Sequence, residues 1–510
     1  MSELDKHPEH DLDNAVVRED SIGEDLPAPK SELDRIYRKL DFRIIPALWC
    51  LYFLTSFGSS VYGVTLTMNK KQGHSLPQSL GMDDVKSKKT LSTASALYYV
   101  GYIVFDVPMN LIMTKVSPQS WLARIVITVG LVYTCYIALE SSHALIAVRF
   151  ISGMVGAGTW PGLSYYISLW YPNERSVRRI GYYFTAAQIS AAAAGLVSAG
   201  FQKMDGVRGY YGWQWMYLVY GCVTITCGIS LLWWLPDRPF KTTNDSTSKI
   251  MIWYNKYFTP RHPLNSREAA IHRKDIESRY TLVRWTWKDV AGICMDLRLW
   301  PLIIMYFGVV GTGFGLAVFG TTIIQANNPK LTSINVSLLY APIWLFDLGG
   351  ILTITPFADH FKKYRAFFFC GACLIIITGM LVTTFAHGPW NRYAGLLIAG
   401  YGLGPTVPIC MSLSAEIFGP IYGDSGIAVS AAVVSGLGNL GSVTATYALY
   451  RGWPADAKRL YRGSNLVLVG MLGGSIIAAL VCYFIKDKVG KTIKTSEESS
   501  ETSQISEDMK

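Results

Sequence analysis

The segment WPLIIMYFGVVGTGFGLAVFGTTII (Trp300–Ile324) contains 25 residues and no charged side chain. An α-helix needs about 20 such residues to cross the hydrocarbon core of a bilayer. Eleven further stretches of similar length and apolar character accompany it, so the sequence predicts an all-α integral membrane protein with twelve transmembrane helices. The predicted spans are 44–67, 91–114, 121–139, 144–170, 180–201, 214–234, 300–324, 336–357, 366–386, 393–416, 427–449 and 466–485.

Composition supports a chain that is folded in lipid. Hydrophobic residues make up 50% of the 510 residues and charged residues 16%, which excludes an ordinary water-soluble domain of this size. The order of six spans, a polar insert and six more spans predicts two homologous six-helix halves. The predicted organisation is a disordered tail (1–43), a first half (44–235), a central loop (236–299), a second half (300–485) and a second disordered tail (486–510).

Basic residues indicate the orientation of the chain in the membrane. The net charge is +10, and on a membrane protein such an excess more often sets topology than binds nucleic acid. Both termini and the central loop are therefore predicted to be cytosolic. The basic residues that support this orientation are Arg35, Arg38, Lys39, Arg43, Arg175, Arg178, Arg179, Lys362, Lys363 and Arg365. Within the central loop, SREAAIHRKDIESRY (266–280) has the charge pattern of a solvated helix at the membrane surface.

Cysteine and histidine give no sign of catalysis or metal binding. Cys370 and Cys373 form a C-x-x-C pair inside FFFCGACLIII, with no second pair and no nearby histidine. The histidines fall in loops, tails or span ends, and this argues against a membrane-embedded acyltransferase, which would need one at membrane depth. We therefore expect no enzyme activity, no metal and no organic cofactor.

Ionisable residues at membrane depth are the strongest candidates for function, because such a group is costly unless it faces a cavity, a partner or a proton pathway. Four residues qualify: Arg149 in the fourth span, Asp106 in the second, Asp347 in the eighth and Glu416 at the end of the tenth. Arg149 is a candidate counter-charge for a substrate carboxylate; the alternative is a structural tether for the outer end of its helix.

Asp347 lies in LLYAPIWLFDLGGILTITPF with no basic residue within one helical turn. A carboxyl group in such surroundings can bind and release a proton, so Asp347 is the first candidate for proton coupling, followed by Asp106 and Glu416. The alternative for Asp347 is a permanent hydrogen bond to a neighbouring helix. Polar side chains that could orient a ligand, or instead hydrogen-bond between helices, are Tyr62, Tyr165, Gln188, Tyr340 and Asn439.

Several longer motifs point to a family. They are VGYIVFDVPMNLIMTKVSPQSWLAR (Val100–Arg124), RFISGMVGAGTWPGLSYYISLWYPNERSVRR (Arg149–Arg179), DGVRGYYGWQWMYLVYG (Asp205–Gly221) and GLGNLGS (Gly436–Ser442). From about Leu33 to Ile485 the chain resembles the fungal allantoate-permease branch of the major facilitator superfamily. That resemblance implies a proton-coupled symporter of small organic anions. It also implies that Asp359 and Arg365 belong to the short-loop motif that joins adjacent helices.

The chain departs from this family at three positions where the resemblance implies charged residues. Gly58 and Ser59 replace an Asp-Arg pair in the first span, Gly156 replaces a glutamate in the fourth, and Tyr220 replaces a glutamate after the G-W-R-W motif. Inherited substrate and coupling chemistry therefore cannot be carried over at these positions.

The resulting functional prediction is a monomeric plasma-membrane carrier that takes up a small organic anion with protons by alternating access. Candidate substrates are nicotinate, pantothenate, biotin or an allantoate-like nitrogen source. The alternatives are a nutrient sensor on a transporter fold, or a uniporter or exporter of a neutral or organosulfur solute. The endoplasmic reticulum and the vacuole are alternative locations.

Overall fold

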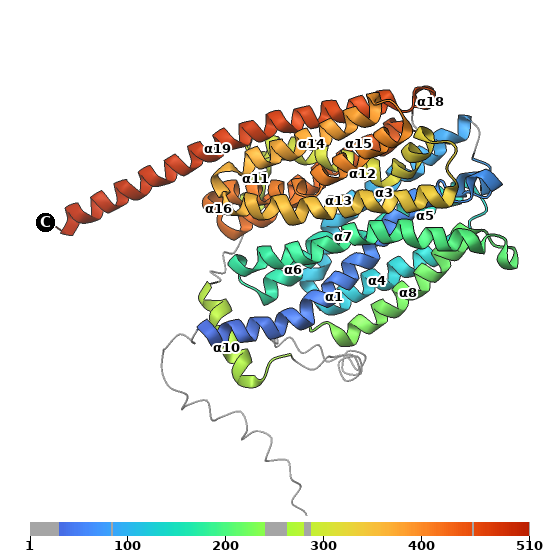
Figure 1. The fold of residues 1–510 in the computed structure, drawn as a ribbon. Helices are drawn as coiled ribbons and strands as arrows, with labels where there is room; N and C mark the ends of the chain where they lie inside the picture. Colours follow the sequence, from blue (N-terminus) through green and yellow to red (C-terminus); the bar gives the residue numbers. More distant parts are fainter. Residues whose placement is uncertain (1–29, 83–84, 240–262, 280–286, 451–452, 509–510) are drawn as a thin grey trace, which may run out of the picture.

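The computed structural model describes residues 30–82, 85–239, 263–279, 287–450 and 453–508, and this part of the chain is helical without β-strands. The long helices form two bundles that lie side by side (Figure 1). The first bundle, the N-half, contains α1 (Lys30–Thr65), α3 (Val85–Lys115), α4 (Pro118–Thr134), α5 (Ser142–Gly156), α6 (Thr159–Trp170), α7 (Asn173–Phe201) and α8 (Gly212–Trp234). The second, the C-half, contains α12 (Leu299–Asn327), α13 (Ser333–His360), α14 (Arg365–Phe385), α15 (Pro389–Leu403), α16 (Thr406–Gly438), α17 (Leu440–Ala448) and α19 (Arg462–Asp508).

The two ends of the bundle are distinguished by their connections. One end, here called the insert face, carries the start of α1 and the helices of the central loop, α10 (Ser266–Arg279) and α11 (Trp287–Met295). The other end, the opposite face, carries the connections between α1 and α3 and between α7 and α8. Along the boundary between the halves, α7 packs against α13 and α3 packs against α17.

Transmembrane character agrees with the twelve predicted spans. Ten helical segments of the described residues are long and apolar enough to cross a bilayer. The other two predicted spans correspond to α3, which carries Asp106 among its apolar residues, and to the end of α16 together with α17. The fourth span is broken into α5 and α6 at Gly158, whose φ of 80° is readily adopted by glycine.

Helix α16 supplies parts of two spans because it folds back on itself. The Ser414 hydroxyl donates a hydrogen bond to that of Ser430 at 2.9 Å. Sixteen residues of a straight α-helix would separate these positions by about 24 Å. Gly419 likewise lies against Ile427, with 3.1 Å between an ideal Cβ on the glycine and the isoleucine Cδ1. The turn between the tenth and eleventh spans therefore lies within α16.

The two tails differ from the sequence prediction. Residues 30–43 were assigned to a disordered tail, but α1 already begins at Lys30. Residues 486–508 are likewise part of α19, which extends beyond the bundle (Figure 1). Both segments lack proline, and each directly continues a helix that packs in the bundle, so helix extension needs no new nucleation. Residues 1–29 lie outside the described part of the chain.

The central loop contains the predicted helix, but α10 is docked on the N-half and is not surrounded by solvent. His272 is buried, and its Nε2 atom lies 2.9 Å from the carbonyl oxygen of Trp170 at the end of α6. Tyr37 of α1 donates a hydrogen bond to Asp275 at 2.6 Å, and Lys39 pairs with Glu268 at 2.7 Å. The contact with Lys39 lowers the pKa of the Glu268 carboxyl. Helix α11 packs instead on α16 of the C-half.

An ionic cluster joins the helices of the C-half at the insert face. Arg365 donates to Asp359 and to Glu416, each at 2.7 Å, and Lys486 pairs with Glu416 at 2.5 Å. Because these residues come from α13, α14, α16 and α19, the cluster holds four helices together. The contact between Asp359 and Arg365 is the one that the family resemblance implies.

Contacts between the halves are concentrated toward the opposite face. The Thr321 hydroxyl donates to the Gly63 carbonyl oxygen at 2.9 Å, and the Gln202 amide donates to the Ser337 hydroxyl at 2.9 Å. An ideal Cβ on Gly195 would lie 2.7 Å from the Ser337 carbonyl oxygen. We refer to the contacts of these five residues as the seal.

Gly63 is the position at which the seal is most sensitive to substitution. An ideal Cβ there would lie 2.2 Å from the backbone oxygen of Ala317, which cannot move as a flexible side chain could. We expect Gly63→Ala to separate the halves at the opposite face and to lower transport about tenfold or more, because a closed state loses its packing. Labelling of a cysteine placed at Ser337 should increase correspondingly.

The matched control is Gly200→Ala, toward the same face, where an added Cβ meets nothing within 4 Å. This variant should transport normally. Equal loss in both variants, or unchanged labelling in Gly63→Ala, would contradict the assignment of the seal.

Candidate functional site

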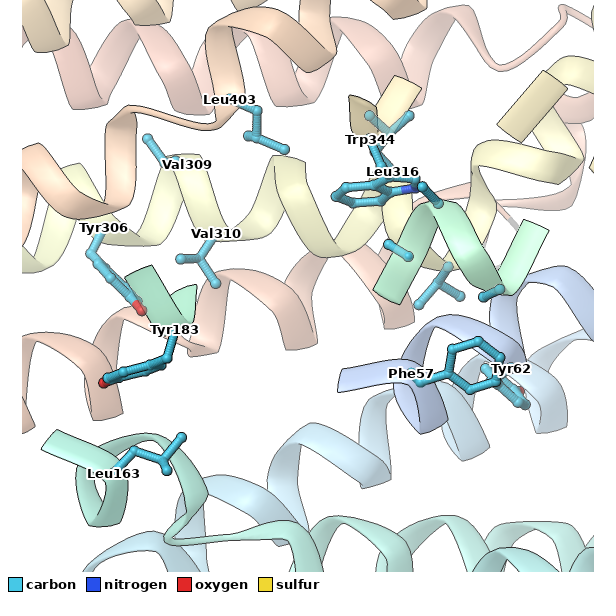
Figure 2. Packing of buried hydrophobic residues seen from close by; sticks show 14 of the residues in the cluster. Phe57, Tyr62, Leu163, Tyr183, Tyr306, Val309, Val310, Leu316, Trp344 and Leu403 are labelled. Atoms are coloured by element: carbon cyan, nitrogen blue, oxygen red, sulfur yellow. The ribbon is translucent and has the colours of Figure 1, made fainter. Parts of the chain in front are cut away.

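A central cavity lies between the two halves, on the insert-face side of the seal. Its volume is about 240 Å³. Figure 2 shows Tyr306, Val310 and Trp344, three of its C-half side chains. The N-half residues that line it are Tyr52, Thr55, Ser56, Ser59, Ser60, Tyr98, Tyr99, Tyr102, Val129, Tyr133, Ser152, Gly156, Thr159, Trp160, Phe184, Ala187, Gln188 and Ala191. Those from the C-half are Tyr306, Val309, Val310, Gly313, Phe314, Ala317, Trp344, Asp347, Leu403, Gly404, Val407, Ser435 and Asn439.

The two walls of this cavity differ in chemistry. The N-half wall carries hydroxyl groups on α1, where Ser56, Ser59 and Ser60 are spaced as one helical face. Ser59 and Ser60 donate to the Ser56 carbonyl oxygen at 2.8 and 3.2 Å, so their oxygen lone pairs are free to accept from a ligand. The C-half wall is largely aliphatic and aromatic, with a few polar groups set into it.

Asp347 is the carboxylate of the cavity wall. Its side chain is buried, its Oδ1 atom has no hydrogen-bond partner, and the Gln188 side chain approaches it from the other half. An ideal Cβ on Gly404 would lie 2.7 Å from Oδ1, so only glycine leaves room for the carboxylate there. The structure describes no ion pair for this residue. Asp347 therefore faces the cavity without a cation, as a group that exchanges a proton or contacts a ligand would.

Arg149 lies behind the N-half wall and does not line the cavity. Its Cζ atom is 3.8 Å from the centre of the Tyr62 ring and 4.5 Å from that of the Tyr98 ring. The side chain is 1% exposed, and its Nε and Nη1 atoms have no hydrogen-bond partner. Two neighbours of Arg149 do line the cavity. Tyr98 stacks on the guanidinium, and Ser152 lies one turn further along α5. Arg149 thus provides a positive field behind a neutral wall.

The other residues predicted to contact substrate divide into two groups. Gln188 and Asn439 line the cavity. Tyr62 is stacked on Arg149, and Tyr340 donates to the Ala317 carbonyl oxygen at 2.9 Å within the C-half. Tyr165 lies on α6 away from the cavity wall. Tyr62 and Tyr340 thus make hydrogen bonds between helices, which is the alternative role that the sequence offers for them, and Tyr165 is partly buried.

The second and third candidates for proton coupling, Asp106 and Glu416, lie outside the cavity, unlike Asp347. Asp106 accepts a hydrogen bond from the backbone N–H of Gly158 at 2.9 Å, so it joins α3 to the start of α6. Glu416 is held by Arg365 and Lys486 in the ionic cluster of the C-half. Both carboxylates have structural partners, and Asp347 is the candidate whose carboxyl group faces the cavity.

The positions that depart from the family resemblance have compensating neighbours. An ideal Cβ on Gly58 would lie 2.6 Å from the Tyr220 hydroxyl, so a small and a large residue fit together where charges are implied. The Tyr220 hydroxyl donates to the Leu54 carbonyl oxygen at 2.6 Å. Gly156 lines the cavity, and its nearest neighbour is the Tyr98 hydroxyl at 3.9 Å from an ideal Cβ.

Sequence reasoning missed Trp344, because an indole in an apolar helix resembles ordinary core. Its Nε1 atom has no hydrogen bond of good geometry among the described residues, and the nearest acceptor described for it is the Tyr340 hydroxyl. The signal that could have found it is spacing: Trp344 and Asp347 are three residues apart and share a helix face. The same rule connects Ser435 with Asn439, both of which line the cavity.

Two helical halves around a central cavity, sealed toward one face, have the architecture of a membrane carrier. The model of the Major Facilitator Superfamily matches residues 48–446, and the chain belongs to this family. The family and fold make the protein a multi-pass membrane transporter and not an enzyme.

Individual relatives support this assignment. The chain is 46% identical over 471 residues to "Vitamin H transporter 1" of Schizosaccharomyces pombe, covering 90% of this chain and 82% of that protein. It is 28% identical over 448 residues to a "Putative tartrate transporter" of Agrobacterium vitis, covering 88% and 94%. Among solved structures, an inward-facing, unoccupied bacterial homologue of the human lysosomal transporter Spinster is similar in fold, with a TM-score of 0.62 and 14% identity over 87% and 96% of the two chains.

Proposed function

We propose that this carrier takes up biotin across the plasma membrane together with protons. The observation that carries the proposal is the cavity itself, in which a buried cation lies behind one wall and an unpaired carboxylate is set into the other. The relative that is 46% identical bears the name of vitamin H, which is biotin. Another relative is named for tartrate, a small organic acid, which supports the carboxylate class more broadly.

The hydroxyl-bearing N-half wall suits the carboxylate of such a substrate. The Tyr133 hydroxyl, which belongs to this wall and has no hydrogen-bond partner among the described residues, can donate to a carboxylate. Arg149 adds an attractive field in surroundings of low dielectric. The aliphatic C-half wall suits an apolar ring. A substrate held by both walls favours closure around itself, because it makes contacts that the open state lacks.

Asp347 is proposed as the proton-coupling group. In its charged form it would disfavour a neighbouring anion, and in its protonated form it removes a negative charge from the cavity. Binding of the anion and of the proton thereby favour each other, and this thermodynamic coupling is what symport requires. The carrier is proposed to function as a monomer, with a complete cavity in one chain.

Uptake into cells that lack their own biotin carrier tests the proposal. Expression of the chain should restore growth on low biotin and accumulation of labelled biotin, and a proton uncoupler should abolish accumulation. A panel of nicotinate, pantothenate and allantoate provides the comparison. Rescue by one of these and not by biotin would replace the proposed substrate.

The insert face is proposed to be cytosolic. Arg35, Arg175 and Lys362 are among the basic residues at this face, where the positive-inside rule places them. We expect an accessibility tag near Asn244, which lies outside the described residues, to react only after the cells are permeabilised. A tag in the connection between α7 and α8 should react in intact cells, and the reverse pattern would invert the orientation.

A further inference from the structure

Three residues that line the cavity where α7 packs against α13 each carry a buried polar atom with no hydrogen-bond partner among the described residues. The atoms are Asp347 Oδ1, Gln188 Oε1 and Trp344 Nε1. The three residues are 1%, 8% and 7% exposed, so water satisfies these atoms poorly. Buried polar atoms are normally hydrogen-bonded, and exceptions that converge on one cavity indicate a site that a ligand completes.

The hydrogen-bonding character of this cluster is specific. The Gln188 side chain donates toward the Asp347 carboxylate and leaves its Oε1 atom as an acceptor. Asp347 Oδ1 is the second acceptor and the Trp344 indole N–H is a donor. A ligand that satisfies all three atoms must offer two donors and one acceptor close together.

We propose that this cluster is the subsite for the cyclic urea of the substrate, with the urea N–H groups donating to Asp347 and Gln188 and the urea oxygen accepting from Trp344. The inference rests on the proposed function, since biotin carries such a ring. The neighbouring side chains Val309, Val310 and Leu403 are apolar and suit the rest of the bicycle. The carboxylate would then lie toward the N-half wall.

This arrangement places the urea between the two halves and the carboxylate toward the N-half wall. Asp347 and Trp344 belong to α13, whereas Gln188 belongs to α7 of the N-half. The urea would therefore bridge the halves at the place where α7 and α13 already pack. It would also be recognised independently of the carboxylate, so the two ends can be tested separately.

The test uses counterflow exchange in vesicles containing the full-length protein, because exchange does not depend on the proton gradient. The ligands are biotin, desthiobiotin, which keeps the urea, and 2-iminobiotin, in which an N–H group replaces the urea oxygen. Lipoate, a ring-bearing carboxylate without urea, serves as a competitor. The wild-type protein should accept desthiobiotin. It should accept 2-iminobiotin about tenfold less well, because the added N–H group of this ligand and the N–H of Trp344 are two donors that face each other.

Trp344→Phe removes the N–H and keeps an aromatic ring. We expect this variant to raise the KM for biotin about tenfold and to reduce the ratio by which the carrier prefers biotin to 2-iminobiotin. The inhibition of exchange by lipoate should be unchanged. Gln188→Leu should weaken the binding of biotin and of desthiobiotin by the same factor. Trp300→Phe, at an exposed tryptophan of α12 outside the cavity, is the matched control and should change none of these values.

Two different failures can be distinguished. In the first, the wild-type protein exchanges biotin, while Trp344→Phe and Gln188→Leu change the affinities for biotin and lipoate by the same factor. In that case the urea subsite is wrong and the proposed function stands. If the wild-type protein exchanges neither biotin nor desthiobiotin, both the substrate and its subsite are overturned.

Discussion

Uptake should be lost when Arg149 is replaced by alanine, while the protein still reaches the membrane. The guanidinium is the buried cation behind the hydroxyl-bearing wall, and its Nε and Nη1 atoms have no partner in the described structure. Its removal should raise the KM for an anionic substrate about 10- to 100-fold, because the field of a buried charge acts strongly in surroundings of low dielectric. Surface labelling and uptake kinetics measure the two effects separately.

Folding should tolerate this change because Arg149 has no described ion-pair partner. No carboxylate would be left buried and unpaired, which is the usual reason that breaking a buried pair is costly. Arg149→Lys should rescue uptake poorly, because a compact ammonium cannot stack between the rings of Tyr62 and Tyr98 as the planar guanidinium does.

A biotin derivative with an amide in place of the carboxylate makes the assignment specific. Its binding should be nearly the same in wild-type protein and in Arg149→Ala, whereas biotin binding should differ. Arg208→Gln removes an exposed cation at the opposite face and should leave both ligands unaffected. Normal uptake by Arg149→Ala would move anion recognition to another part of the chain.

Asp347→Asn should separate accumulation from exchange. Asparagine has nearly the shape of a protonated aspartic acid and keeps an Oδ1 acceptor, so substrate binding and counterflow should survive. Uphill accumulation should fail because the side chain can no longer bind and release a proton. Measurement of labelled substrate inside vesicles, with and without an imposed proton gradient, shows both results.

The matched controls for this experiment are Asp106→Asn and Glu416→Gln. Their carboxylates contact the Gly158 backbone and the Arg365 side chain and do not line the cavity, so neither variant should abolish coupling once its expression is accounted for. Full, pH-dependent accumulation by Asp347→Asn would exclude Asp347 as the coupling site. Loss of counterflow as well as accumulation would indicate a binding or folding defect instead.

The sequence could predict the depth of residues in the membrane more readily than the direction in which they point. Long apolar runs place the helices and set two halves around an insert, because hydrocarbon imposes a fixed length on each span. In a helix such as α13, however, both the lipid-facing and the buried sides are apolar. Tyr340 and Asp347 both lie within the predicted eighth span, yet the first packs against α12 and the second belongs to the cavity wall.

For Arg149, too, the sequence predicts burial but not what the side chain faces. Its burial could be predicted from its position in the fourth span, but its separation from the cavity depends on Tyr62 and Tyr98, which come from two other helices. Tertiary contacts of this kind leave no local pattern. Asp347 and Gln188 meet for the same reason, since no spacing rule connects α7 with α13.

The seal also determines how the carrier responds to the solution at the opposite face. Its hydrogen bonds come from the neutral side chains of Thr321 and Gln202, and its closest contacts are between glycines and backbone oxygens. Ionic strength screens charged pairs and has little effect on such contacts. The salt concentration should therefore leave these contacts unchanged, and an acid dependence of closure at this face would have to come from the neighbouring ion pair between His74 and Asp205 and not from the seal itself.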